Sequence, residues 1–83
     1  MDKYWFDKTA IYYKEETIHQ IKNEMKKRSI TQKDLAWILH RTEASVSRKL
    51  NGNRDFTFEE LLIISTVFDM DLLELVKYKV VTL

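Results

Sequence analysis

The sequence predicts an all-α fold. Its 83 residues include no proline and one glycine, which is too few turn residues for an all-β chain of this length. Apolar side chains recur three and four residues apart in several stretches, the spacing of a buried helical face, and capping residues precede these stretches. A chain this short forms one domain and buries only about 60–65% of its unfolded surface, so its stability is modest unless it dimerises.

Residues 1–16 form an aromatic arm ahead of the helices. Five aromatic side chains fall in this arm: Tyr4, Trp5, Phe6, Tyr12 and Tyr13. We expect the arm to be ordered, packed either on its own domain or on a neighbouring subunit. The run 10–13 fits a strand or an early turn of the first helix, and periodicity does not decide between them.

The first helix is predicted over residues 17–28. Its apolar face consists of Ile18, Ile21 and Met25. Thr17 and Gln20 have the spacing of a capping box. The basic residues at the end of this helix suit the negative pole of its dipole.

Two short helices joined by a tight turn follow in residues 31–52. Thr31 caps the first of them, with Asp34 as a short capping-box partner. Thr42 caps the second, which ends at Gly52, where a left-handed backbone is wanted. A connection of three or four residues makes the two helices cross steeply. This is the helix-turn-helix arrangement.

The second helix of this pair has an inner and an outer face. Val46 and Leu50 lie four residues apart and point inward. The predicted outward residues are small or basic: Ala44, Ser45, Ser47, Arg48 and Lys49. Small residues allow close approach of the backbone to another surface, and basic residues attract phosphate, as a helix entering a DNA major groove requires. An ordinary amphipathic surface helix has the same pattern.

A fourth helix follows Thr57, which forms a capping box with Glu60, and Asp71 caps a fifth helix that ends near residue 76. The predicted buried face of the fourth helix consists of Phe58, Leu61, Ile64 and Phe68. Leu62 and Ile63 fall partly outside this stripe, either in a fuller core or in a contact patch.

The tail, residues 77–83, is rich in β-branched residues and has the composition of a short edge strand. A lone strand is unstable, so the tail needs a partner. That partner is either the N-terminal arm or the same tail of a second subunit.

The charges are unevenly distributed although the net charge is only +1. Bases predominate in residues 22–54, and acids without bases in residues 55–74. The chain has no cysteine, which fits a reducing cytoplasm, and no apolar run long enough to span a membrane. Its beginning is too polar and aromatic for a signal peptide. We therefore expect a cytoplasmic protein without a membrane partner.

From residue 17 to 76, the chain resembles the Cro and phage-repressor type of helix-turn-helix DNA-binding domain, the XRE family. The resemblance rests on Thr31-Gln32, Leu35-Ala36, Val46-Ser47-Arg48, Leu50-Asn51-Gly52, Thr57, Leu61, Ile64, Phe68, Asp71 and Leu75. It implies a five-helix, phage-repressor-like bundle over residues 17–76, flanked by the arm (1–16) and the tail (77–83).

The resemblance also implies a DNA-binding surface. Gln32 matches a position that clamps a phosphate at a helix N-terminus. The front of the recognition helix, residues 43–45, matches positions that read base edges. The full predicted set is Gln32, Lys33, Arg41, Thr42, Glu43, Ala44, Ser45, Ser47, Arg48, Lys49, Asn51 and Arg54.

Four positions depart from the family pattern. His40 stands where the turn usually has glycine, and a left-handed histidine there carries some cost. Arg41 replaces an aliphatic residue and adds a cation close to where DNA would lie. Asp69 replaces the glycine after the fourth helix. Glu43 is repelled by phosphates but can accept a hydrogen bond from cytosine N4, so it either reads a cytosine or indicates that the helix faces a protein.

The expected function is therefore a sequence-specific transcriptional regulator of the phage or mobile-element repressor type. It would bind double-stranded DNA as a homodimer, with helix 43–50 of each subunit in a major groove. The alternative is a protein-interaction module on the same fold, an antirepressor or antitoxin-like partner of a second regulatory protein. Its supports are Glu43, the near-neutral charge, the aromatic arm, and exposure of Trp37, Leu62 and Ile63. We expect no enzyme and no cofactor, because the two histidines lie on different elements and no residues have metal-ligand spacing.

Overall fold

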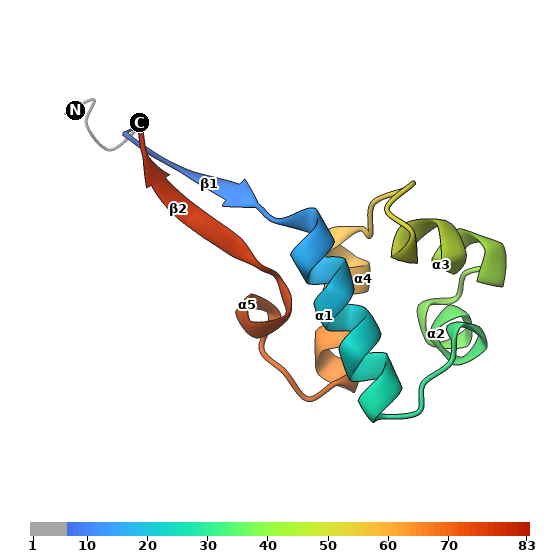
Figure 1. The fold of residues 1–83 in the computed structure, drawn as a ribbon. Helices are drawn as coiled ribbons and strands as arrows, with labels where there is room; N and C mark the ends of the chain where they lie inside the picture. Colours follow the sequence, from blue (N-terminus) through green and yellow to red (C-terminus); the bar gives the residue numbers. More distant parts are fainter. Residues whose placement is uncertain (1–6) are drawn as a thin grey trace.

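The computed structural model describes residues 7–83 and contains five helices and a two-stranded sheet (Figure 1). In chain order the elements are β1 (Lys8–Tyr12), α1 (Lys14–Lys27), α2 (Gln32–Leu39), α3 (Glu43–Leu50), α4 (Phe58–Val67), α5 (Leu72–Leu75) and β2 (Tyr78–Thr82). The prediction of an all-α fold is approximately right, because the bundle is helical and the short strand expected in the tail is present as β2. The first six residues, which include three of the arm's aromatics, lie outside the described residues.

β1 and β2 form an antiparallel ribbon that projects from the bundle (Figure 1). Ala10 pairs with Val80, and Tyr12 pairs with Tyr78. The tail therefore pairs with the N-terminal arm, which is one of the two partners predicted for it. Thr17 joins the base of the ribbon to α1, because its hydroxyl accepts a hydrogen bond from the Lys77 backbone N–H at 2.9 Å.

The prediction that Thr17 caps the first helix is wrong. α1 begins at Lys14, one turn earlier, directly after the strand. The Thr17 side chain is fully buried and its hydroxyl donates to the Tyr13 carbonyl oxygen at 2.9 Å. Gln20 makes no capping contact and instead donates to Glu24 at 3.4 Å. The strand fixes where the helix begins, and a capping pattern read from local sequence does not include that constraint.

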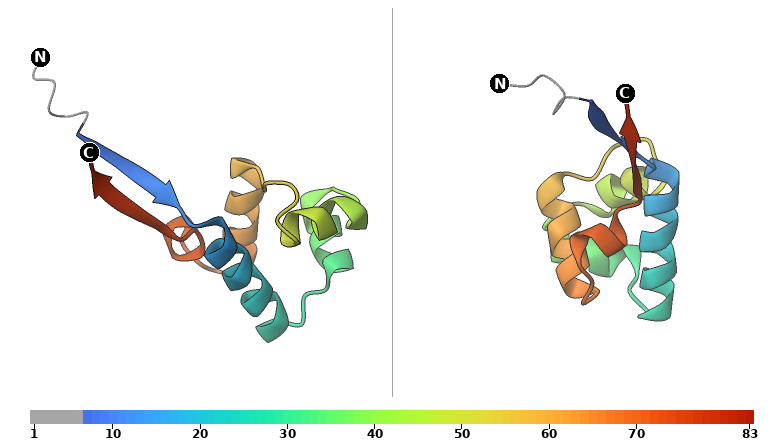
Figure 2. Two further views of the ribbon diagram at one scale, coloured as in Figure 1. Left: turned by 45° about the horizontal axis from the view of Figure 1, so that its top comes forward. Right: turned by 90° about the vertical axis from the view of Figure 1, so that its left-hand side faces the viewer.

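The helices enclose one apolar core, with α1 and α4 on opposite sides of the bundle and α5 between them (Figure 2). The buried core residues are Ile21, Met25, Leu35, Ala36, Leu39, Val46, Leu50, Ile64, Phe68 and Leu75. Phe58, predicted to be buried, is 68% exposed. The inward position in the first turn of α4 is occupied by Glu60 instead, so the apolar row begins at Leu61, which is half-buried.

Capping residues and residues with a left-handed backbone define several helix ends. Asp34 N–H donates to the Thr31 hydroxyl at 3.1 Å, and Thr31 N–H donates to the Asp34 carboxylate at 2.9 Å, so the predicted capping box is complete. Hydrogen bonding of the Asp34 carboxylate by the backbone and the side chain of Thr31 lowers the pKa of Asp34. His40 has φ of 54° and Asp69 has φ of 54°, the left-handed conformation that glycine adopts more readily.

Candidate nucleic-acid interface

α3 lies on the core with one face and presents the other to solvent. Val46 and Leu50 are buried, which fixes the rotation of the helix about its axis. The Thr42 hydroxyl accepts from Ser45 N–H at 3.1 Å and caps the N-terminus, as predicted. The outer face carries Glu43, Ala44 and Arg48, which are exposed, and Ser45 and Ser47, which are half-buried. An exposed helix face with small residues at its front can approach a groove closely.

The remaining predicted contact residues surround α3. Gln32 and Lys33 are exposed in the first turn of α2, where free backbone N–H groups favour an anion. Asn51 and Arg54 are exposed in the loop after α3. Of the twelve residues predicted to contact DNA, all except Lys49 are exposed or half-buried. They come from α2, the turn, α3 and the following loop.

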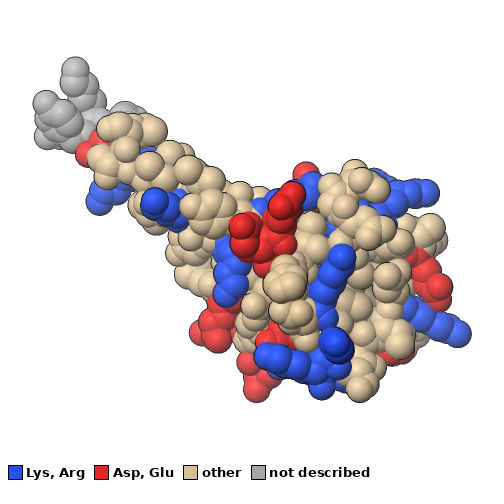
Figure 3. All heavy atoms as spheres, viewed as in Figure 1, with Lys and Arg blue, Asp and Glu red and all other residues tan. Residues whose placement is uncertain are grey.

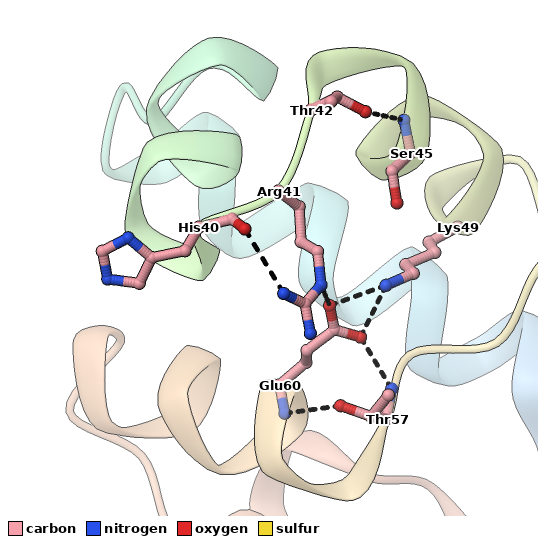
Figure 4. A network of polar contacts seen from close by, with 7 residues as sticks. All are labelled: His40, Arg41, Thr42, Ser45, Lys49, Thr57 and Glu60. Atoms are coloured by element: carbon pink, nitrogen blue, oxygen red, sulfur yellow. Dashed lines mark hydrogen bonds and ion pairs between the residues drawn. The ribbon is translucent and has the colours of Figure 1, made fainter.

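Lys49 is not an outward residue, contrary to the prediction. The residue is only 5% exposed, and its Nζ donates to both carboxylate oxygens of Glu60, at 2.7 and 2.6 Å (Figure 4). Glu60 lies eleven residues away on α4. Lys49 therefore joins α3 to α4 and is not available to a ligand on the outer face.

Glu60 is the centre of a polar network beneath the helix-turn-helix (Figure 4). In addition to Lys49, its carboxylate accepts from Thr57 N–H at 2.8 Å, and Arg41 Nε lies 3.2 Å from its Oε2. The Glu60 N–H donates to the Thr57 hydroxyl at 3.0 Å, which completes the predicted capping box. Burial alone would raise the pKa of Glu60, but the hydrogen bonds from Lys49 and Thr57 outweigh it and the pKa is lowered. The carboxylate is thus charged at neutral pH.

The loop after α3 is held by the start of α1. Lys14 Nζ donates to the Gly52 carbonyl oxygen at 2.8 Å and lies 2.7 Å from a carboxylate oxygen of Asp55. Gly52 itself has φ of 80°, so the only glycine of the chain ends α3 as predicted. These contacts fix the backbone on both sides of Arg54. This role of Lys14 is not apparent from the sequence pattern, which places the residue in the arm.

Acidic and basic side chains are interspersed on the face of the molecule drawn in Figure 3. Blue side chains project where α2 and α3 lie, with red ones among them, so this face has no uninterrupted basic patch. Regularly spaced negative charges on a ligand would therefore be contacted by separate lysine and arginine side chains. Phosphates of a duplex present such charges.

Comparison with known families decides the class of the domain. A family model described as a Cro/C1-type HTH DNA-binding domain matches residues 20–80, which includes α2, the turn, α3 and the following loop. The chain belongs to this family. The Cro/C1-type domain accounts for the helix-turn-helix of α2 and α3 and makes this a DNA-binding protein. No curated protein and no solved structure gives a significant match.

The described part of the chain also bears on metal binding and on membrane insertion. Within residues 7–83, no three His, Asp or Glu side chains are placed to hold a metal ion together. No helix in the same range has the length and apolar character needed to cross a membrane.

Proposed function

We propose that this Cro/C1-type domain is a sequence-specific transcriptional regulator of the phage-repressor type, with α3 as the recognition helix. The observation that carries the proposal is the division of α3: Val46 and Leu50 anchor it to the core while Ala44, Ser45 and Arg48 face outward. A helix held in this way can enter a major groove without moving relative to its domain.

Each of these outward side chains and Gln32 then has a distinct role. Arg48 binds guanine or a phosphate, since a guanidinium fits both in a bidentate manner. Gln32 binds a phosphate at the N-terminus of α2. Ser45 and Glu43 contact base edges, and a carboxylate at position 43 selects cytosine through its N4 amino group.

The regulator acts as a homodimer in this proposal. The support is the ribbon: an isolated two-stranded sheet is only marginally stable, and both outer edges of β1 and β2 are free within the described residues. Ile11, Tyr12, Tyr78 and Val80 are each more than 40% exposed. A second subunit would cover them. The seam is formed either by the ribbon or by α5 together with the tail.

Two lysine substitutions distinguish between these two possible dimer interfaces. Val80→Lys places a charge in the middle of the exposed ribbon, and Leu73→Lys places one on the exposed side of α5, where Leu73 is 65% exposed. Sedimentation equilibrium should show a dimer for the wild type, a monomer for Val80→Lys and a dimer for Leu73→Lys. A monomer for Leu73→Lys would instead place the seam at α5 together with the tail. A wild type that stays monomeric at high micromolar concentration, with and without DNA, would exclude the dimer.

Selection of bound duplexes from a randomised library tests the proposed function. We expect enrichment of a two-fold motif with half-sites about ten base pairs apart, or a multiple of this spacing, because both recognition helices must reach the same side of the duplex. The selection should be run at moderate salt, since phosphate contacts weaken steeply as salt rises. Failure of folded protein to enrich any sequence would contradict the proposal.

A protein-interaction module is the second candidate, and specific observations favour it. Trp37 on α2 is 80% exposed, and Phe58 on α4 is 68% exposed. Exposed apolar side chains of this size are common in protein contacts. Under this candidate, a folded sample would enrich no duplex but would form a stoichiometric complex with another regulator.

A further inference from the structure

Glu60 is shared by two cations that belong to the DNA-facing part of the fold. Lys49 comes from the last turn of α3, and Arg41 comes from the connection between α2 and α3 (Figure 4). The Glu60 side chain is 3% exposed, whereas the Arg41 side chain is 48% exposed. One buried acid therefore holds the recognition helix at its end and the turn before its start.

Arg41 is anchored on one side only. Its Nε faces Glu60 at 3.2 Å, and its Nη1 donates to the neighbouring carbonyl oxygen of His40 at 3.3 Å. Within residues 7–83, Nη2 donates no hydrogen bond. Arg41 directly precedes Thr42, the N-cap of α3. The guanidinium thus lies beside the start of the recognition helix with part of its donor edge available to a ligand.

We propose that Glu60 is a positioning residue for DNA binding, which fixes the orientation of α3 through Lys49 and directs the Arg41 guanidinium toward a DNA phosphate. This inference rests on the proposed DNA-binding function. Glu60 itself does not touch DNA, because its carboxylate is enclosed by α3, α4 and the turn. Its effect is transmitted by the two cations that it holds.

When the Glu60 carboxylate is removed, the loss of negative charge and the loss of positioning are expected to change the DNA affinity in opposite directions. Removing a carboxylate near a DNA-binding face makes the protein more positive, which strengthens attraction to the phosphate backbone. Releasing Arg41 and α3 from their common anchor weakens binding, because a guanidinium that must first be ordered loses binding free energy. The direction of the change in affinity therefore distinguishes the two.

The test compares Glu60→Gln with Glu59→Gln, which removes the same charge from an exposed neighbour on α4. The probe is the duplex enriched by the wild-type protein, and circular dichroism defines a temperature at which all variants are folded. We expect Glu60→Gln to weaken binding about tenfold, the size of one lost charge-assisted contact. Glu59→Gln should leave the affinity unchanged or slightly higher. Equal effects of the two substitutions would overturn the inference.

A double-mutant cycle with Arg41→Ala tests the connection between the residues. Arg41→Ala should weaken binding about tenfold in the wild type but less than about twofold in the Glu60→Gln background. Equal losses in both backgrounds would show that Arg41 acts without Glu60 and would refute the positioning role. A wild type that selects no duplex would instead refute the proposed function, so the two failures are distinguishable.

Glu60→Gln leaves Lys49 buried without its charge partner and can therefore unfold the domain. If it does, the cycle is repeated in the double variant Lys49→Met with Glu60→Leu, which replaces the buried pair by apolar side chains of similar size. This background keeps the contact between α3 and α4 but leaves Arg41 unanchored. The same disappearance of the Arg41→Ala effect is expected, and persistence of the full effect would again refute the inference.

Discussion

Replacing Lys49 with alanine should lower the free energy of unfolding by about 3 kcal/mol, as expected when one partner of a buried ion pair is removed. The Glu60 side chain is 3% exposed, and among residues 7–83 the substitution leaves it Arg41 as its one remaining cation partner. The substitution also removes the stem of Lys49 from between α3 and α4. Urea denaturation followed by circular dichroism measures the change.

Lys33→Ala is the matched control, because Lys33 is an exposed lysine on the neighbouring helix α2. Its effect on stability should stay within about 0.5 kcal/mol. If Lys49→Ala were equally mild, Lys49 would behave as a surface residue and the buried network would be incorrect. Lys49→Met combined with Glu60→Leu should recover most of the lost stability, since an apolar pair carries no desolvation penalty.

Low pH should also lower the free energy of unfolding, because protonation removes the negative charge of Glu60. The pKa of Glu60 is lowered in the folded state, so the folded protein holds its proton less tightly than the unfolded chain. The stabilisation is complete above the pKa of an unfolded glutamate, about 4.3, and is lost as the pH falls through the folded value. Asp34, whose pKa is also lowered, adds to the loss in the acid range. Glu60→Gln should therefore flatten, but not abolish, the decline in stability below about pH 4.

Local sequence signals predicted those parts of the fold that depend on local contacts. The Thr31–Asp34 and Thr57–Glu60 boxes each join residues three apart, so a short stretch of chain contains both partners. The end of α3 at Gly52 likewise depends on the conformational freedom of one residue. The outward face of α3 followed from the spacing of Val46 and Leu50. These features required no knowledge of how the helices pack.

The missed features depend on contacts between distant segments. Lys49 looked like an outward base because nothing near it in sequence revealed that Glu60, eleven residues on, faces it across the core. Thr17 looked like a cap because its hydrogen-bond partner Lys77 is sixty residues away. Phe58 has the spacing of a core residue, but it is exposed. Helical periodicity gives the spacing of apolar residues, whereas tertiary contacts decide which side of the helix is buried. Such errors are corrected only when the tertiary arrangement is available.

Arg48→Ala should reduce affinity for the selected duplex tenfold to about a hundredfold, which corresponds to roughly 1–3 kcal/mol for a lost bidentate contact. Arg48 is exposed on α3, with the core residues Val46 and Leu50 on the opposite side, so folding should be unaffected. Fluorescence anisotropy titrations at several salt concentrations measure the affinity and its salt dependence. A thermal melt of the same sample verifies the fold.

The dependence of the lost affinity on DNA sequence and on salt concentration identifies the partner of Arg48. If Arg48 binds a guanine, the variant loses discrimination at one base pair and keeps its affinity for duplexes altered there. If Arg48 binds a phosphate, affinity falls equally for all sequences and the salt slope decreases by about one. Lys27→Ala is the charge-matched control, because Lys27 lies in the last turn of α1, where its Nζ is 3.6 Å from Glu24. Equal losses for Arg48→Ala and Lys27→Ala would mean that DNA responds only to net charge, and α3 would no longer be the recognition helix.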